Sequence, residues 1–148
     1  MITDIEQETL DIDWFFTDGN EIAFVASGGG RLPFYVSNKS MEEIESIAEH
    51  FKDLPIISEV VINPDIDKFI TRGTNKREYL SYFVEIAEKG LFSFDKSISN
   101  SFSDLNYHLV AKPITPLKFD ELPLEIANGV ARVSIDLSNK NGFNIDSF

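Results

Sequence analysis

The 148-residue sequence contains no cysteine, and this absence excludes disulfide bridges and thiolate chemistry. No apolar run approaches the roughly 18 residues that a membrane span needs. The first residues, MITDIEQETL, lack the basic and apolar regions of a signal peptide. We therefore expect a protein of the reduced cytoplasm that does not enter a membrane.

Basic residues are scarce as well. There are 13 Lys and Arg against 25 Asp and Glu, which gives a formal net charge of -12, and no Lys or Arg precedes Arg31. This charge repels nucleic-acid phosphates and anionic lipids, so we expect no nucleic-acid partner. Complementary charge speeds the encounter with a basic partner. Acidic residues can also simply keep a protein soluble, without any basic partner, and that alternative stays open.

Motifs for catalysis or metal binding are missing. The only histidines, His50 and His108, lie far apart, and neither a zinc motif nor G-x-S-x-G is present. We interpret His108, within the apolar run YHLVA, as a structural histidine. The oxygen spacing from Asn63 to Asp67 resembles the start of a calcium loop, but Lys68 stands where that loop needs Gly. We expect neither a metal nor a cofactor.

Three consecutive glycines, Gly28 to Gly30, follow the run EIAFVAS. They lack the spacing of a dinucleotide-binding G-x-G-x-x-G loop, and Arg31-Leu32-Pro33 follows instead of a helix. We interpret them as a strand end that needs a positive φ. An anion-binding nest of backbone amides beside Arg31 is one alternative, and the close approach of a partner's backbone is another.

Local patterns predict an α+β fold in one domain, residues 1–148, with an antiparallel sheet packed against about two main helices. A hairpin is expected over 12–27, because Asp18-Gly19-Asn20 joins two β-rich runs. The main helices are expected over 41–52, capped by Ser40, and 75–89, capped by Asn75. Further strands are expected over 56–62, 91–95, 106–113 and 129–137. Short helical turns are expected through Phe69 and over about 122–127, and a loosely held tail is expected from about 139.

The candidate partner-binding residues are acids near the N-terminus, one aromatic residue and the acids of the first main helix. Trp14 is either part of the core or an exposed anchor for a partner. The helix glutamates are either a binding surface or an ordinary solvated face. The full set is Asp11, Asp13, Trp14, Asp18, Glu21, Glu42, Glu45 and Glu49.

Four stretches together resemble a known group of proteins: DWFFTDGNEIAF, the glycine run with LP after it, a helix ending in FKDLP, and YHLVAKPITPLKFDELP. The sequence is similar over residues 12–127 to small bacterial proteins of the immunity type, from polymorphic toxin and contact-dependent inhibition systems. The matching motifs are structural, so the resemblance carries no catalytic residues. It implies a protein that neutralises a cognate toxin.

The leading hypothesis is therefore a non-enzymatic binding protein whose acidic surface covers the active site or an exosite of a basic toxin. A small hydrolase with a carboxylate pair is an alternative from another class, and it predicts a concave pocket with converging acids. A structural or regulatory module without a toxin partner is the third. The sequence does not define the toxin, the binding face or the oligomeric state.

Overall fold

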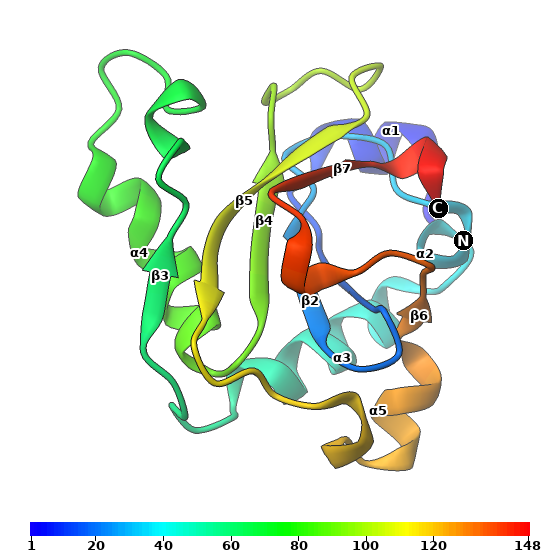
Figure 1. Ribbon diagram of the computed structural model, residues 1–148. Coiled ribbons are helices and arrows are strands. Elements are labelled where there is room, and N and C mark those ends of the chain that lie inside the picture. The colour runs from blue at the N-terminus through cyan, green and yellow to red at the C-terminus, as the bar shows by residue number, and fades with distance from the viewer.

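A computed structural model describes all 148 residues. The chain forms a single small α+β domain built on a mixed sheet of seven strands (Figure 1). The strands are β1 (Asp13–Thr17), β2 (Ile22–Ala26), β3 (Val60–Ile62), β4 (Phe92–Lys96), β5 (Asn106–Pro113), β6 (Ala131–Arg132) and β7 (Gly142–Asn144). The helices are α1 (Asp4–Thr9), α2 (Phe34–Ser37), α3 (Met41–Lys52), α4 (Lys76–Glu88) and α5 (Leu124–Gly129). Four 3-10 turns complete the chain: η1 (Ile66–Lys68), η2 (Phe119–Glu121), η3 (Leu137–Asn139) and η4 (Ile145–Ser147).

The expectation of an antiparallel sheet is wrong in part. The strand order is β3-β5-β4-β2-β1-β6, and β7 pairs with β5. Two pairs, β2 with β4 and β1 with β6, are parallel. The crossover from β2 to β4 includes α3 and α4, and such a long helical connection is what a parallel pair requires. The hairpin β1–β2 and the antiparallel pair β4–β5 are as predicted.

The two main helices begin and end where their capping residues predicted. The Ser40 hydroxyl accepts a hydrogen bond from the Glu43 amide, and the Asn75 side chain accepts one from the Glu78 amide. Both helices cover one face of the sheet, where Phe15, Phe24, Phe51 and Phe83 form a core. Neither helix, nor any of the others, combines the length and apolar composition that crossing a membrane demands.

The opposite face of the sheet has a second core, and the C-terminal segment covers it. Trp14, Phe16 and Phe94 are buried there beneath Phe143 and Phe148. The Phe143 ring stacks on Tyr107 with 5.1 Å between centroids. In place of the expected loose tail, the last residues therefore pair with β5 and pack against the core. Of the strand expected over 129–137, only the two residues of β6 are extended in the sheet.

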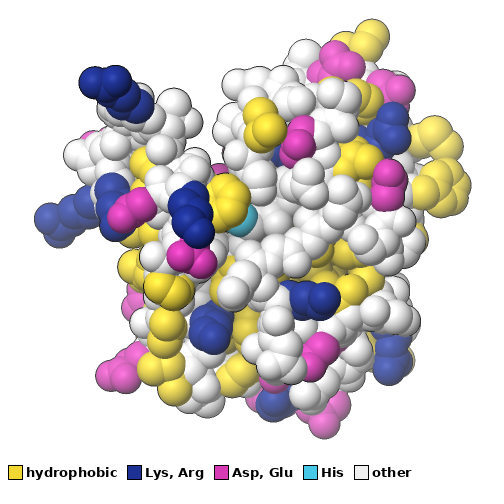
Figure 2. Space-filling model, turned by 45° about the horizontal axis from the view of Figure 1, so that its top comes forward, with side chains coloured by type: hydrophobic (Ala, Val, Ile, Leu, Met, Phe, Trp, Pro, Cys, Tyr) yellow, Lys and Arg dark blue, Asp and Glu magenta, His cyan; other side chains and the backbone are white.

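An arm projects from one side of the domain, formed by the chain between β3 and α4 (Figure 1). It contains η1 and the exposed residues 71–75, and the exposed run continues over 76–78 into the first turn of α4. Lys and Arg side chains gather on this side of the molecule (Figure 2), and residues 68–77 contain Lys68, Arg72, Lys76 and Arg77 but no acid. This basic stretch follows directly after Asp65 and Asp67, which balance the charges of Lys68 and Arg72 within the arm itself.

Candidate functional site

The structure brings several of the predicted acids together around one groove. The segment 10–13 and helix α3 enclose about 310 Å³ over a floor that includes Ile12, Ile44 and Ala48. Leu10 lies at the rim and is 42% exposed. The ionisable side chains of the groove are Asp11, Asp13, Glu45 and Lys52. We call this feature the acidic groove, since its lining contains three carboxylates and one ammonium group.

Hydrogen bonds fix two of these carboxylates. Asp11 Oδ1 accepts from the Gly28 amide at 2.9 Å. Asp13 Oδ2 accepts from the Tyr82 hydroxyl at 2.7 Å and lies 3.4 Å from Lys52 Nζ. Burial raises the pKa of Asp13, although the Tyr82 hydrogen bond and the Lys52 charge act in the opposite direction. Both carboxylates are therefore held in place before any partner arrives.

The other predicted residues divide into two groups. Trp14 is 1% exposed and Glu21 is 5% exposed, so neither side chain is available to a partner. Glu21 lies 3.3 Å from Lys118 Nζ, and Asp18 accepts from backbone amides of its own turn and from Leu137. These side chains hold the fold together. Glu42, Glu45 and Glu49 are exposed on α3.

The glycine run is a strand end, as predicted. Gly28 and Gly29 have φ values of +52° and +76°. The Gly28 amide donates to Asp11 and the Gly30 amide donates to the Ser27 carbonyl, so both are already engaged inside the protein. The run also makes room for Lys96, because a Cβ on Gly30 would lie 2.5 Å from Lys96 Cε.

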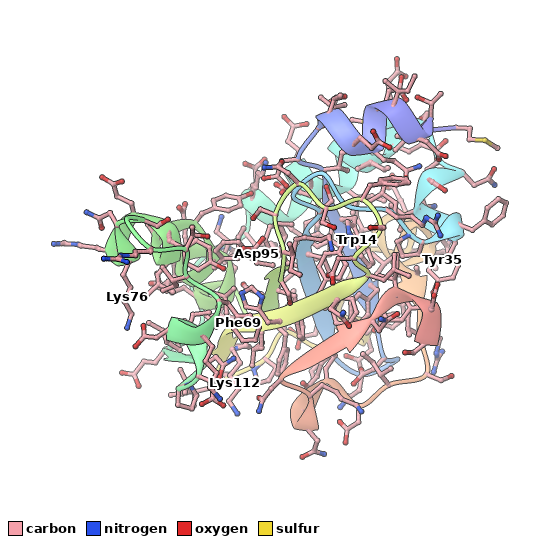
Figure 3. The ribbon with its side chains drawn as sticks, turned by 90° about the horizontal axis from the view of Figure 1, so that it is seen from above. Trp14, Tyr35, Phe69, Lys76, Asp95 and Lys112 are labelled. Carbon is pink, nitrogen blue, oxygen red and sulfur yellow. The ribbon has the colours of Figure 1, made fainter.

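A row of polar residues crosses the sheet on the face that α4 covers. Cross-strand pairing places Asp13 opposite Ala26, Ala26 opposite Asp95, and Asp95 opposite His108. Partners of this kind project from the same face of a sheet. Figure 3 shows Asp95 near the middle of the molecule. We call Asp13, Asp95 and His108 the polar row, and Ala26 lies between the two carboxylates.

Helix α4 supplies a phenol to each carboxylate of the polar row. Tyr82 donates to Asp13, and Tyr79, one helical turn away, donates to Asp95 Oδ2 at 2.7 Å. Tyr79 Oη also lies 3.0 Å from His108 Nε2. Because the phenol has one proton and gives it to Asp95, His108 Nε2 donates to Tyr79. His108 Nδ1 then accepts from Ser97 Oγ, which lies 3.2 Å away.

Burial sets the protonation states of this network. It raises the pKa of Asp95 to about 6 and lowers the pKa of His108 to about 4. Burial also raises the pKa of Tyr79, and the Asp95 charge adds to that effect. At neutral pH the imidazole is therefore neutral and Asp95 is ionised. The Phe69 ring stacks on the imidazole at 4.0 Å between centroids.

The interpretation of His108 as a structural histidine agrees with these contacts, since both ring nitrogens have partners. The sequence reasoning did not find Asp95, Tyr79 or Ser97. Tyr79 and Tyr82 could have been found from the sequence, because they widen the apolar stripe of α4 with side chains that carry hydroxyl groups. No sequence pattern points to Asp95, because its place in the polar row depends on the parallel pairing of β4 with β2.

Nowhere in the structure do three His, Asp or Glu side chains converge in a way that could hold a metal ion. Comparison with known proteins found no matching family model, no matching curated protein and no matching solved structure. The geometry of the acidic groove and of the polar row is therefore the basis for a functional proposal.

Proposed function

We propose that this chain is a non-enzymatic binding protein of the immunity type, which neutralises a cognate bacterial toxin by covering a basic surface of that toxin. The acidic groove is the observation that carries the proposal. Three carboxylates surround an apolar floor there, two of them are fixed by hydrogen bonds, and Lys52 is the single cation.

This groove suits a lysine or arginine side chain of the partner. The aliphatic part of such a side chain would cover Ile12, Ile44 and Ala48, and its charged end would reach the carboxylates. Glu42 and Glu49 extend the negative surface along α3. A surface of one sign raises the rate of encounter with a partner of the opposite sign. Inhibition then follows from occlusion.

The hydrolase hypothesis needs a carboxylate pair that converges on one substrate. The two half-buried carboxylates of the polar row, Asp13 and Asp95, do not do this. Strand β2 lies between them, so their Cα atoms are separated by two strand spacings, or roughly 10 Å. Asp13 lines the acidic groove, whereas Asp95 lines a different hollow on the far side. We therefore favour binding over hydrolysis.

The test is co-expression with the C-terminal domain of the protein encoded directly upstream of the gene for this chain. We expect a stable 1:1 complex on size exclusion and restored growth of cells that express the toxin domain. The double variant Glu45→Lys/Glu49→Lys should weaken the complex, whereas Asp120→Lys/Glu125→Lys, which changes net charge equally on exposed acids elsewhere, should not. Equal weakening by both doubles would remove the acidic groove from the proposal, and the absence of a complex would contradict the function itself.

A further inference from the structure

A second hollow lies between the arm and the end of β4, with a volume of about 340 Å³. The arm contributes Phe69, Ile70, Thr71 and Thr74, and the chain from the end of β4 contributes 95–99. Tyr79 of α4 completes the lining. In Figure 3, Phe69 and Asp95 lie near one another at this place. We call it the arm hollow.

Asp95 is a half-buried carboxylate of the arm hollow, and no cation is paired with it. None of the five ion pairs of the structure includes Asp95. The neighbouring Lys96 directs its ammonium group to Asp104, 3.0 Å from Oδ1, and is fully buried there. Buried charges in proteins are normally paired, because an isolated charge loses its hydration without compensation. An unpaired carboxylate that faces an open hollow is the feature that a cationic ligand would complete.

The arm does not supply that cation. None of Lys68, Arg72, Lys76 and Arg77 lines the arm hollow. Lys68 pairs with Asp65, and Lys76 pairs with Asp67 at 2.7 Å. On the other side, His108 is neutral and donates its one N–H to Tyr79. The network around Asp95 therefore orients the carboxylate without neutralising it.

We propose that the arm hollow binds a primary ammonium group, carried by a small amine or by a lysine side chain of a partner. A compact ammonium fits better than a guanidinium. Asp95 Oδ2 already accepts from Tyr79 and Oδ1 from the Lys96 amide, so the two-oxygen fork that arginine uses is occupied. The hydroxyl groups of Thr71, Thr74, Ser97 and Ser99 line the same hollow as further acceptors.

The rest of the lining suits the carbon chain of such a ligand. Phe69, Ile70 and Ile98 offer apolar surface, and Phe69 and Tyr79 offer aromatic rings, which attract cations. A volume of about 340 Å³ is within the range of small-ligand sites. The site is separate from the acidic groove, so a free amine would bind whether or not the proposed toxin exists.

The test is an NMR titration of the ¹⁵N-labelled protein with n-butylamine, with Nα-acetyl-lysine methylamide, and with n-butanol as the neutral match. We expect saturable shifts of the Thr71, Thr74, Ser97 and Ser99 amides with the two ammonium probes and none with butanol. Asp95→Asn should reduce the affinity at least tenfold, because it removes the charge and keeps an acceptor for Tyr79. Asp120→Asn, an exposed acid elsewhere, should leave the affinity unchanged.

The same titrations separate the two sources of the ammonium group. Equal binding of both probes indicates a free amine, whereas stronger binding of the lysine derivative indicates a side chain of a partner. No saturable shift with either probe, or equal affinity in Asp95→Asn, would overturn the proposal. If Asp95→Asn does not fold, the wild-type protein decides. Its affinity for n-butylamine should fall as the pH drops below about 6, where Asp95 becomes protonated, and an affinity that is constant from pH 5 to 7.5 would refute the site. None of these outcomes depends on the complex with the toxin domain.

Discussion

Asp95 and His108 are cross-strand neighbours, and burial reverses the order of their pKa values. The pKa of the carboxyl group rises to about 6 and that of the imidazole falls to about 4, because burial disfavours the charged form of each. The two shifts have opposite consequences for stability. A raised Asp95 pKa stabilises the fold below its ordinary value of 3.8, and that stability is lost as the pH rises through 6. A lowered His108 pKa makes stability fall as the pH drops from 6.5 toward 4.

We therefore predict that the two contributions nearly cancel in the wild-type protein between pH 4 and 6.5, and that single substitutions reveal them. In Asp95→Asn only the histidine contribution is left, so the free energy of unfolding should rise with pH over this range. In His108→Gln only the aspartate contribution is left, so the free energy of unfolding should fall as the pH rises over this range. Each change should be on the order of 1–2 kcal/mol after solvent screening. Urea unfolding at several pH values measures both slopes, relative to wild type, and slopes of the same sign would contradict the assignment.

The triple glycine is a second feature at the scale of single residues. Gly30 has no positive φ, so the need for glycine there comes from close packing alone. A Cβ would lie 2.5 Å from Lys96 Cε and 2.9 Å from the Ser27 carbonyl oxygen. Lys96 cannot easily withdraw, because its buried ammonium group binds Asp104.

Gly30→Ala is expected to destabilise the protein by about 2–3 kcal/mol, as overpacked cores do. Gly73→Ala is the comparison, since a Cβ there meets no atom within 4 Å and only its φ of +90° opposes the change. That variant should lose only about 1 kcal/mol. Thermal or urea unfolding of both proteins checks the order, and a Gly73→Ala loss as large as that of Gly30→Ala would show that packing against Lys96 is unimportant.

At the scale of elements, the sequence predicted what is local. Helices α3 and α4 follow from caps and an apolar stripe, and the β1–β2 hairpin follows from Asp18-Gly19-Asn20. Both signals lie within the element itself. The parallel pairing of β2 with β4 depends on contacts between residues about 70 positions apart, and no local pattern encodes it. The polar row is a consequence of that pairing, which is why Asp95 was missed.

The C-terminal segment shows the same limit. NKNGFNIDSF is polar apart from Phe143, Ile145 and Phe148, so its composition suggests a loose tail. Those three side chains nevertheless close the second core over Trp14 and Phe16. A few apolar residues suffice because the sheet already presents an aromatic surface for them to cover.

Phe143→Ala is therefore expected to destabilise the protein by about 2–4 kcal/mol, as large-to-small core substitutions do. Its ring lies within 5.3 Å, between centroids, of Phe16, Phe94, Tyr107 and Phe148. Phe34→Ala is the matched control, because Phe34 is 71% exposed and should change stability by less than about 0.5 kcal/mol. Urea unfolding followed by the fluorescence of Trp14 measures both. A small loss for Phe143→Ala would mean that the tail is held as loosely as its composition suggests.

At the scale of the whole molecule, charge is unevenly distributed. The first 30 residues carry seven acids and no base, whereas residues 68–77 carry four bases and no acid. The sequence showed that the N-terminal end is acidic, but not which of its acids hold the fold and which line the groove. Asp18 and Glu21 hold the fold, Asp11 and Asp13 line a groove, and Glu45 joins them from α3. That division depends on tertiary structure, because it follows from which side chains find partners inside the protein.

The long-range part of this field can be tested by the rate of association with the proposed toxin domain. Glu45→Lys/Glu49→Lys changes the charge by +4 without removing a hydrogen bond that holds the fold, since neither side chain has a partner in the structure. We expect association about tenfold slower than wild type at low salt, because steering by charge is strongest there. The salt dependence of the rate should also become flatter, while Asp120→Lys/Glu125→Lys should retain most of the wild-type slope. Stopped-flow mixing at several ionic strengths measures these rates. If both double variants slow association equally, the encounter responds to net charge alone. If only Glu45→Lys/Glu49→Lys slows it, the partner first makes contact at the acidic groove, because a local field decays within about 10 Å at 0.1 M salt.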